Sequence, residues 1–116
     1  MIFVFGSNRA GRHGKGAALT ATRDFGAKRG VGEGRTGDSY AIPTKDENLR
    51  TLPLSEVEKG VSLFCEYARA NPDLIFALTP VGTGLAGLNK RDIALLFRKY
   101  RIPSNVYLTS SWISDG

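Results

Sequence analysis

Residues 2–19 read IFVFGSNRAGRHGKGAAL, and this stretch decides the fold because it joins an apolar segment to a helix through a glycine-rich loop. The apolar residues 2–5 predict a buried strand, and the pattern after the loop predicts a helix over about 16–28. Residues 6–16 hold four glycines and three cationic side chains. Glycine lets a ligand approach the backbone closely, and a helix N-terminus presents unpaired N–H groups at the positive end of its dipole. The stretch therefore predicts a phosphate-binding site.

Composition restricts the class of protein. The 116 residues suffice for one hydrophobic core, so we expect a single domain over residues 1–116. A hydrophobic content of 41% and a charged content of 23% are typical of soluble globular proteins. The net charge of +5 is scattered along the chain, which favours anionic ligands without by itself indicating nucleic acid.

The sequence also indicates a compartment. No run approaches the roughly 18 apolar residues of a membrane helix, and no signal-type segment precedes the first strand. The single cysteine suits a reducing environment. We therefore expect a cytoplasmic protein with no membrane partner.

Strand and helix patterns alternate along the rest of the chain. The first helix is expected to end in Lys28-Arg29-Gly30, and the glycine-rich residues 30–37 predict a loop. Ser55 followed by Glu58 is a capping-box pattern for a second helix. We expect a strand at 39–42 that Pro43 stops, an irregular stretch at 44–53, the second helix from 55 to 71, a strand at 74–78, a helix containing 93–100 and a strand at 105–108. This βαβαβαβ order predicts a largely parallel sheet with helices on both faces.

A second glycine-rich loop, residues 80–87, follows the strand at 74–78. In open α/β sheets ligands bind beyond the C-terminal ends of the strands, and both glycine loops lie at such ends. If the two strands are close in the sheet, the loops face each other and can hold one ligand from two sides. The alternative is that each loop is only a tight connection, but two loops at equivalent strand ends favour ligand binding.

Two common phosphate motifs do not match the first loop. A P-loop has Ser or Thr after its Gly-Lys pair, whereas Gly16 follows Gly14-Lys15 here. The dinucleotide fingerprint needs a tight turn directly after the strand, and this loop is too long for it.

Three blocks of sequence carry a family resemblance: residues 12–18 (RHGKGAA), 40–45 (YAIPTK) and 81–88 (VGTGLAGL). They are similar to an Arg-x-Gly-x-Gly-Ile/Ala-Ala loop, a strand ending in Ile-Thr-Lys and an Ile-Gly-Cys-Gly-Leu-x-x-Leu loop. These motifs resemble those of the macrodomain, an ADP-ribose-binding module, and of its small subgroup that removes terminal ADP-ribose from modified glutamate or nucleobases. The resemblance implies a macrodomain-like three-layer α/β sandwich with a largely parallel central sheet.

The resemblance also implies a ligand, which is ADP-ribose or a related ADP-ribose-containing nucleotide or adduct, and no further cofactor. The first loop would wrap the terminal ribose and a phosphate, with Asn8 near the ribose. The second loop would bind the diphosphate through its N–H groups. The implied ligand-binding residues are Asn8, Arg12, Gly14, Lys15, Gly16, Ala17, Gly82, Thr83, Gly84, Leu85, Ala86 and Gly87.

Lys45 is the implied catalytic residue, because a lysine at its position attacks the ribose C1″ carbon in the subgroup. An aspartate after the Gly-Leu pair of the second loop completes turnover there, but Ala86 occupies that position here. Asp46 and Asp38 are the candidate substitutes. The acidic residue that recognises adenine in macrodomains lies upstream of the matched blocks, so the resemblance names no adenine-binding residue.

Other reactive side chains have plainer interpretations. His13 is the only histidine, which argues against a metal site or a Ser-His-Asp triad, and we expect it at the surface. Cys65 therefore lacks the histidine partner of a cysteine nucleophile. Trp112 is expected to pack against the body of the domain.

Three functions stay open on the sequence alone. The first is an enzyme that acts through Lys45 on ADP-ribosylated protein or nucleic acid. The second is a non-catalytic module that reads or sequesters ADP-ribose-containing molecules, which Ala86 favours. The third is a nucleic-acid-binding domain that uses the basic loops, with the fold as a scaffold.

Overall fold

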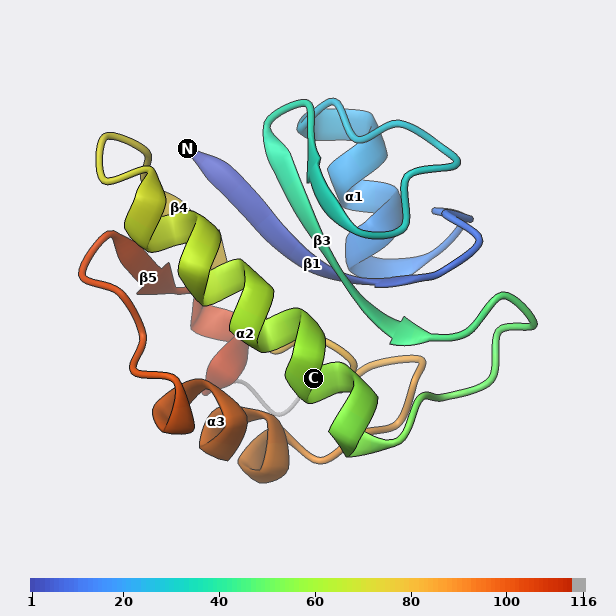
Figure 1. Ribbon diagram of the computed structural model, residues 1–116. Helices are drawn as coiled ribbons and strands as arrows, with labels where there is room; N and C mark the ends of the chain where they lie inside the picture. The colour runs from blue at the N-terminus through green and yellow to red at the C-terminus, as the bar shows by residue number, and fades with distance from the viewer. Residues whose placement is uncertain (114–116) are drawn as a thin grey trace.

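A five-stranded sheet with the order β2-β3-β1-β4-β5 organises the computed structural model, which describes residues 1–113. Four strands are parallel: β1 (Ile2–Asn8), β3 (Ser39–Lys45), β4 (Phe76–Leu78) and β5 (Val106–Leu108). The short edge strand β2 (Gly34–Thr36) is antiparallel to β3. The predicted largely parallel sheet is confirmed, with β1 at its centre (Figure 1).

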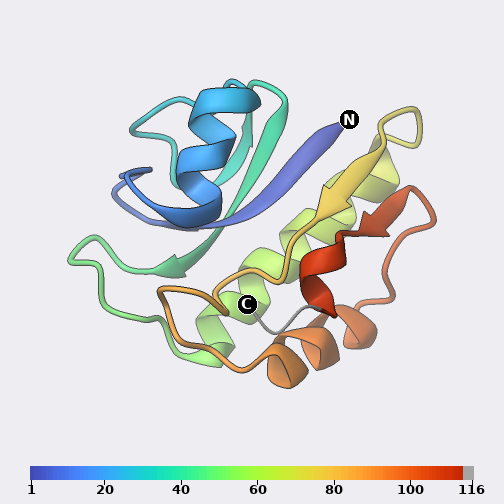
Figure 2. The same cartoon turned by 180° about the vertical axis from the view of Figure 1, so that it is seen from behind.

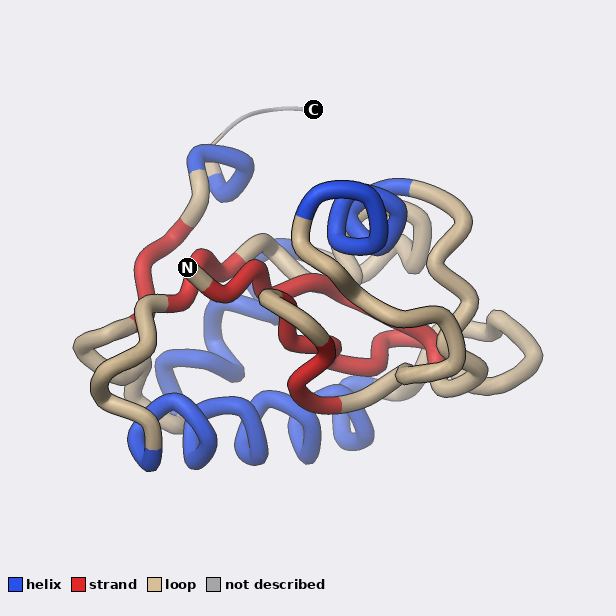
Figure 3. Tube along the Cα trace, turned by 90° about the horizontal axis from the view of Figure 1, so that it is seen from above, coloured by secondary structure: helices blue, strands red, loops and turns tan. Residues whose placement is uncertain are grey.

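Helices cover both faces of the sheet. α1 (Gly16–Asp24) lies on one face, and α2 (Leu54–Ala70) and α3 (Lys90–Lys99) lie on the other, as Figure 1 and Figure 2 show from opposite sides. The 3₁₀ helix η1 (Ser110–Trp112) is on the same side as α1 (Figure 3). The three-layer arrangement predicted from the sequence is therefore correct. No helix in the described part of the chain combines the length and hydropathy of a bilayer-spanning segment.

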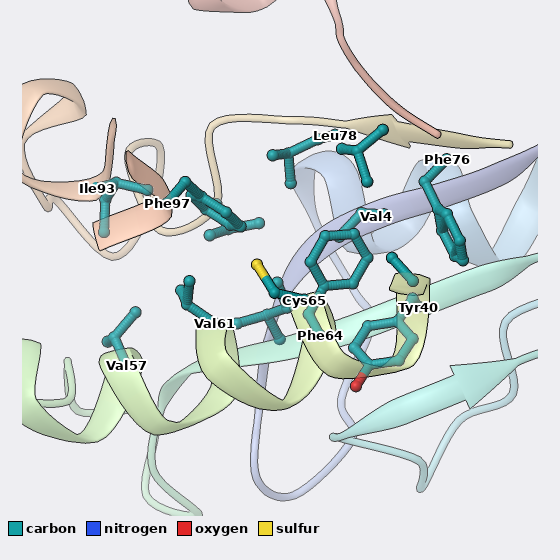
Figure 4. Close-up of a cluster of buried hydrophobic side chains, with 14 of the residues drawn as sticks. Val4, Tyr40, Val57, Val61, Phe64, Cys65, Phe76, Leu78, Ile93 and Phe97 are labelled. Carbon is teal, nitrogen blue, oxygen red and sulfur yellow. The ribbon is translucent and has the colours of Figure 1, made fainter. Parts of the chain in front are cut away.

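The main core fills the space between the sheet and α2 (Figure 4). Val57, Val61, Phe64 and Ala68 recur at helical spacing along one side of α2 and are fully buried. Phe64 makes edge-to-face contacts with the rings of Tyr40, Phe76 and Phe97, from β3, β4 and α3. A smaller cluster of Phe5 and several alanines fills the space under α1.

Several predicted boundaries in the first half of the chain are wrong. The first helix ends at Asp24 rather than near residue 28, because Gly26 takes a left-handed φ of +71° and Ala27 N–H turns back to the Ala21 carbonyl. The stretch predicted as a loop at 30–37 contains β2. Gly34 and Gly37 have φ values of +89° and +58°, backbone angles that favour glycine.

Two local signals in the middle of the chain also mislead. β3 continues through Pro43, where its ladder with β1 is irregular: the register shifts between Ser7 and Asn8, and Thr44 Oγ1 donates to the Ser7 carbonyl. Proline is tolerated in strands at such irregularities. The predicted capping box does not form, because α2 begins at Leu54 and Glu58 instead accepts from the Lys99 amine on α3 at 2.7 Å.

Two strands begin later in the structure than the sequence predicted. Leu74 N–H bonds to the Asn71 carbonyl in a turn, so β4 starts at Phe76 rather than at residue 74. β5 starts at Val106, because the Asn105 side chain donates to the carbonyls of Ala68, Asn71 and Leu74 before the strand.

Candidate ligand-binding cleft

A cleft lies where the loops after β1 and β4 meet. These strands are hydrogen-bonded neighbours, with Val4 paired with Leu78, so the condition for the two glycine loops to face each other is met. The cleft has a volume of about 850 Å³, which is within the range of ~300–1,000 Å³ for small-molecule sites. It lies at the C-terminal ends of parallel strands, where α/β sheets bind ligands.

Most of the residues predicted for the site line this one cleft. Gly87 is the exception: it ends the second loop without lining the cleft, its φ is +73°, and its N–H donates to the Gly84 carbonyl. The predicted residues along the cleft are Asn8, Arg12, Gly14, Lys15, Gly16, Ala17, Lys45, Gly82, Thr83, Gly84, Leu85 and Ala86. Each of the three matched blocks thus contributes residues to one cleft.

Two buried side chains, those of Asn8 and His13, hold the first loop in place. The Asn8 amide donates from Nδ2 to the Arg12 carbonyl at 2.8 Å and accepts the Arg12 N–H at 3.0 Å. This side chain shapes the loop with both ends of its amide, in addition to lining the cleft. The prediction that His13 lies at the surface was wrong: the residue is 1% exposed, its Nε2 lies 3.1 Å from the Val31 carbonyl, and its ring packs perpendicular to that of Phe5. The loop is therefore anchored rather than loose.

The start of α1 lies along the cleft and has no side-chain cap. Lys15 is the N-cap residue, its backbone is extended, and no acidic residue lies in the first turn. Gly16 takes a φ of +59° at the first position. α3 is different, since the Asn89 side chain accepts from the N–H groups of Arg91 and Asp92. An uncapped N-terminus keeps its N–H donors and positive dipole end available for an anion.

The second loop offers a row of backbone donors. Within residues 1–113, the N–H groups of Gly84, Leu85 and Ala86 have no hydrogen-bond acceptor. The loop is braced instead by Leu88 N–H on the Gly82 carbonyl and by Thr83 Oγ1 on the Pro80 carbonyl. Consecutive N–H groups of this kind form concave anion sites.

Two glycines allow the second loop to pack closely over the sheet. A Cβ at Gly6 would lie 2.7 Å from the Gly82 nitrogen, and one at Gly82 would lie 2.9 Å from Thr44 Cγ2. Gly82 also has a φ of +76°. Any side chain at Gly6 or Gly82 would push the second loop away from β1 and β3.

The charges along the cleft are of one sign. Arg12, Lys15 and Lys45 line it, and no carboxylate does so among the described residues. This arrangement favours anionic ligands. It also means that the described cleft contains no acidic group to act as a general base.

Lys45 lies at the end of β3, opposite Asn8 of β1. Its amine has no hydrogen bond or ion pair within residues 1–113, and its backbone pairs with Thr51 in a hairpin that follows β3. Thr51 Oγ1 donates to the Ala86 carbonyl at 2.7 Å, which links the hairpin to the second loop. Thr51 therefore connects Lys45 to Ala86, and both of these residues line the cleft.

Neither candidate substitute for the missing aspartate lines the cleft. Asp46 accepts the N–H groups of Arg50 and Asn48, and the Arg50 bond above all holds the pKa of its carboxyl below the usual value. Asp38 lies at the opposite end of the sheet, where its carbonyl accepts Phe3 N–H. Asp46 therefore acts on its own turn, and Asp38 is out of reach.

Sequence reasoning missed several residues along the cleft. The unpredicted ones are Phe3, Gly6, Ser7, Ala18, Thr20, Thr44, Leu49, Thr79, Pro80, Val81, Thr109 and Ser111. Ala18 and Thr44 lie inside matched blocks, Gly6 and Ser7 belong to the first glycine-rich stretch, and Pro80 and Val81 belong to the second loop, so these six carried a usable signal. Thr109 and Ser111 follow β5, and only the rule that ligands bind at strand ends could have indicated them.

The remaining reactive side chains lie outside the cleft. Cys65 is buried on α2, and burial raises the pKa of its thiol. Trp112 packs edge-on against Phe97, as expected, and its indole N–H donates to the Leu78 carbonyl. The described residues contain no group of three His, Cys, Asp or Glu side chains that could hold a metal ion.

No protein-family model and no curated protein matches this sequence. Solved structures do match. The macrodomain of Mycobacterium tuberculosis DarG is 20% identical, with a TM-score of 0.67 over 92% of this chain and 86% of that chain. A protein of unknown function from Bacteroides thetaiotaomicron is 14% identical, with a TM-score of 0.64 over 93% of this chain and 85% of that chain.

A third structure, Thermosipho africanus DarTG in complex with ADP-ribose, is 19% identical, with a TM-score of 0.62. That match covers 95% of this chain but 38% of the other. The layered sheet, with a cleft at the ends of its parallel strands, makes this chain a three-layer α/β domain. Its fold is that of the macrodomains, as the sequence predicted.

Proposed function

We propose that this protein binds ADP-ribose, or a related ADP-ribose-containing nucleotide, in the cleft between its two glycine loops. The observation that carries the proposal is that two sets of backbone N–H donors lie along the same cleft. The N–H groups of Gly84, Leu85 and Ala86 lack acceptors within residues 1–113, and the uncapped start of α1 lines the same cleft. A diphosphate between them would be bound from both sides.

The electrostatics of the cleft support the same ligand. Two phosphates carry two negative charges, and the three cations along the cleft would offset them without a competing carboxylate in the described residues. Arg12 can also bind a phosphate with two parallel N–H donors.

The position of Lys45 in the cleft indicates in which direction the proposed ligand lies. Lys45 and Asn8 lie at one end of the cleft, beside the hairpin after β3. We assign this end to the terminal ribose, with the diphosphate between the loops. The solved Thermosipho africanus DarTG structure, which matches this fold over 38% of its length, is a complex with ADP-ribose and supports ADP-ribose as the ligand by likeness.

Isothermal titration calorimetry with ADP-ribose, ADP and AMP tests the proposal. We expect ADP-ribose to bind at least tenfold more tightly than AMP, because AMP lacks the second phosphate and the terminal ribose. ADP should fall between them. Equal affinities for AMP and ADP-ribose would mean that the two loops do not hold the diphosphate and ribose together.

A second candidate function is hydrolysis of ADP-ribosyl linkages through Lys45. The observation that favours it is that the Lys45 side chain lines the cleft with no hydrogen bond or ion pair within residues 1–113. Against it stands the lack of a carboxylate among the described cleft residues. We therefore propose that the protein is mainly a binding module, with slow or absent turnover.

Three variants separate binding from hydrolysis on an ADP-ribosylated glutamate peptide. Lys45→Ala should keep ADP-ribose binding. Ala86→Asp should raise turnover above the wild-type rate, because it adds a carboxylate to the cleft that Lys45 also lines, and the double variant should lose that gain. Mass spectrometry of the wild type would reveal a slowly released adduct on Lys45. Fast wild-type turnover that survives Lys45→Ala would rule out this lysine as the nucleophile.

A further inference from the structure

The first glycine loop is tied to a short stretch of backbone, residues 30–32, which we call the support segment. Gly30 N–H donates to the Gly11 carbonyl at 2.9 Å, and Ser7 Oγ donates to the Gly32 carbonyl. A Cβ at Gly11 would collide with the Gly30 backbone, so the two stretches pack main chain against main chain. The shape of the first loop therefore depends on its contacts with the support segment.

His13 adds a side-chain contact to the same segment. The residue is buried, and its Nε2 lies 3.1 Å from the Val31 carbonyl. Because a carbonyl oxygen only accepts, Nε2 carries the proton and Nδ1 of the neutral ring is the acceptor. Arg12 and Gly14, on either side of His13, line the cleft, whereas His13 itself does not. The ring thus anchors, away from the ligand, a loop whose neighbouring residues face the ligand.

The other nitrogen of the His13 ring has no partner. Nδ1 is buried and makes no hydrogen bond within residues 1–113, and the ring packs perpendicular to that of Phe5. A proton added at Nδ1 would make the ring a cation with a second N–H donor, and this donor would have no acceptor. Burying a charged donor without a hydrogen bond is unfavourable. The surroundings of the ring therefore suit its neutral form.

Charged groups near the ring do not supply the missing acceptor. β1, which carries Phe5, has no charged residue. Those on the ring's own loop, beside the support segment and on α1 are Arg9, Arg12, Lys15, Lys28, Arg29, Glu33, Arg23 and Asp24. The Glu33 carboxylate points to α2, where its Oε2 would lie 3.9 Å from a Cβ at Gly60. Within residues 1–113, no carboxylate forms a hydrogen bond or ion pair with the His13 ring.

We propose that His13 is a positioning residue that holds the first loop in its ligand-binding shape only while its ring is neutral, so that ADP-ribose binds more weakly as the pH falls from 7 to 5. Histidine is the side chain that ordinarily gains a proton in this range, and His13 is the only histidine of the chain. A protonated ring favours release of the loop from the support segment, which leaves fewer molecules able to bind. The inference rests on the proposed function and adds regulation by pH to the same cleft.

The direction of the effect separates this inference from simple electrostatics. A positive charge added near the cleft would by itself strengthen the binding of a diphosphate. Release of the loop weakens it. Tighter binding at the lower pH would therefore overturn the inference.

Calorimetry with ADP-ribose at pH 5.0 and 7.0 tests the proposal, since ordinary carboxyl groups stay mostly ionised over this range. We expect the wild type to bind about fivefold or more weakly at pH 5.0. His13→Gln keeps an amide N–H for the Val31 carbonyl and takes up no proton, so its two affinities should agree within about twofold. Equal wild-type affinities at the two pH values, or an unchanged loss in His13→Gln, would contradict the proposal.

Two measurements without ligand distinguish a failure of this inference from a failure of the proposed function. Nitrogen NMR of the wild-type ring at pH 7.0 should show the Nε2–H tautomer, and the Nδ1–H tautomer would overturn the inference. At pH 5.0 the amides of Gly11 and Gly30 should exchange with solvent faster in the wild type than in His13→Gln, and equal rates would overturn it too.

Should His13→Gln fail to fold, the tautomer and the wild-type affinities at the two pH values decide the matter. A wild type that binds ADP-ribose at neither pH would overturn the proposed function. The pH-dependent hold of His13 on the loop would then stand or fall by the tautomer and the exchange rates.

Discussion

Gly84 is the residue at which the proposed diphosphate contact can be tested most cleanly. A Cβ built there meets nothing within 4 Å, and Gly84 is not among the glycines with positive φ. Gly84→Val should therefore fold normally and place a branched side chain in the space where we locate phosphate. We predict a loss of ADP-ribose affinity of more than tenfold, which corresponds to about 1.4 kcal/mol.

Calorimetry measures that loss, and the thermal midpoint of the variant checks its fold. Gly84→Ala is the matched control and should lose less affinity, since a methyl group fills less of the cleft. A folded Gly84→Val protein with wild-type affinity would place the ligand away from the second loop.

Individual residues show where sequence reasoning succeeded and where it stopped. The glycines of the two loops are visible in the sequence, because only backbone freedom and close approach explain so many of them together. Asn8 and His13 are different. Their side chains bond to carbonyls of Arg12 and Val31, and such contacts depend on how the loop folds back, which no local pattern encodes.

Among the elements, the hairpin after β3 links the end of that strand to the second loop, because Thr51 pairs with Lys45 and donates to the Ala86 carbonyl. Asp46 accepts the N–H groups of Arg50 and Asn48 inside this hairpin, and the lowered pKa of its carboxyl follows mainly from the Arg50 bond. Because the pKa is lowered on folding, the ionised Asp46 carboxylate stabilises the hairpin at pH values above the ordinary carboxyl pKa of 3.8. That stabilisation is lost as the pH falls through the lowered pKa and the carboxylate takes up a proton.

We predict that Asp46→Ala makes the amides of Asn48 and Arg50 exchange faster with solvent at neutral pH. Hydrogen exchange followed by NMR measures this. Glu47→Ala, one residue along the same exposed turn, is the control and should leave both rates unchanged. Equal exchange in Asp46→Ala and the wild type would show that other contacts hold the hairpin.

Long apolar patterns predicted the elements better than short polar signals did. α2 was identified because Val57, Val61, Phe64 and Ala68 repeat at helical spacing. β2 was missed because its three residues carry no apolar pattern, and pairing with β3 alone makes it a strand. The Ser55 capping box failed because Glu58 has two distant partners, Lys99 of α3 and Tyr100 directly after it, which a local pattern does not show.

At the scale of the whole molecule, one aromatic side chain joins the layers on the α2 side. Phe64 is fully buried and contacts rings from three other elements. We predict that Phe64→Ala lowers the free energy of unfolding by about 3–5 kcal/mol, measured by urea denaturation. Leu63→Ala is the control: its side chain is 49% exposed, so its loss should be small. Similar losses for both variants would contradict the packing described here.

The net charge of +5 allows a test of the nucleic-acid alternative. A polymer bound through 6–10 phosphates loses roughly 10³–10⁵ in affinity between 50 and 200 mM salt, whereas a pocket for two phosphates loses far less. We predict that ADP-ribose affinity falls less than about tenfold over this range. Any binding of a plain oligonucleotide should be weak and salt-labile, and should not compete with ADP-ribose. Strong competition would favour the nucleic-acid interpretation.

The overall architecture was predictable because the alternation of strands and helices leaves few topologies for a parallel sheet. The order of the strands was not. The sequence placed glycine loops after two strands, but only the pairing of β1 with β4 brings those loops together. The lining of the cleft depends on the same long-range arrangement, since it joins Phe3 from the start of the chain to Ser111 near its end.

The central claim is that backbone N–H groups from the two loops bind one diphosphate. The most direct measurement is a ¹H–¹⁵N NMR titration of the labelled protein with ADP-ribose, with adenosine as the ligand that lacks phosphate. We predict large, saturable shifts of the Gly84, Leu85 and Ala86 amides and of the Gly16 and Ala17 amides with ADP-ribose, and small shifts of these amides with adenosine. Saturable binding of ADP-ribose that leaves both sets of amides unshifted would contradict the claim.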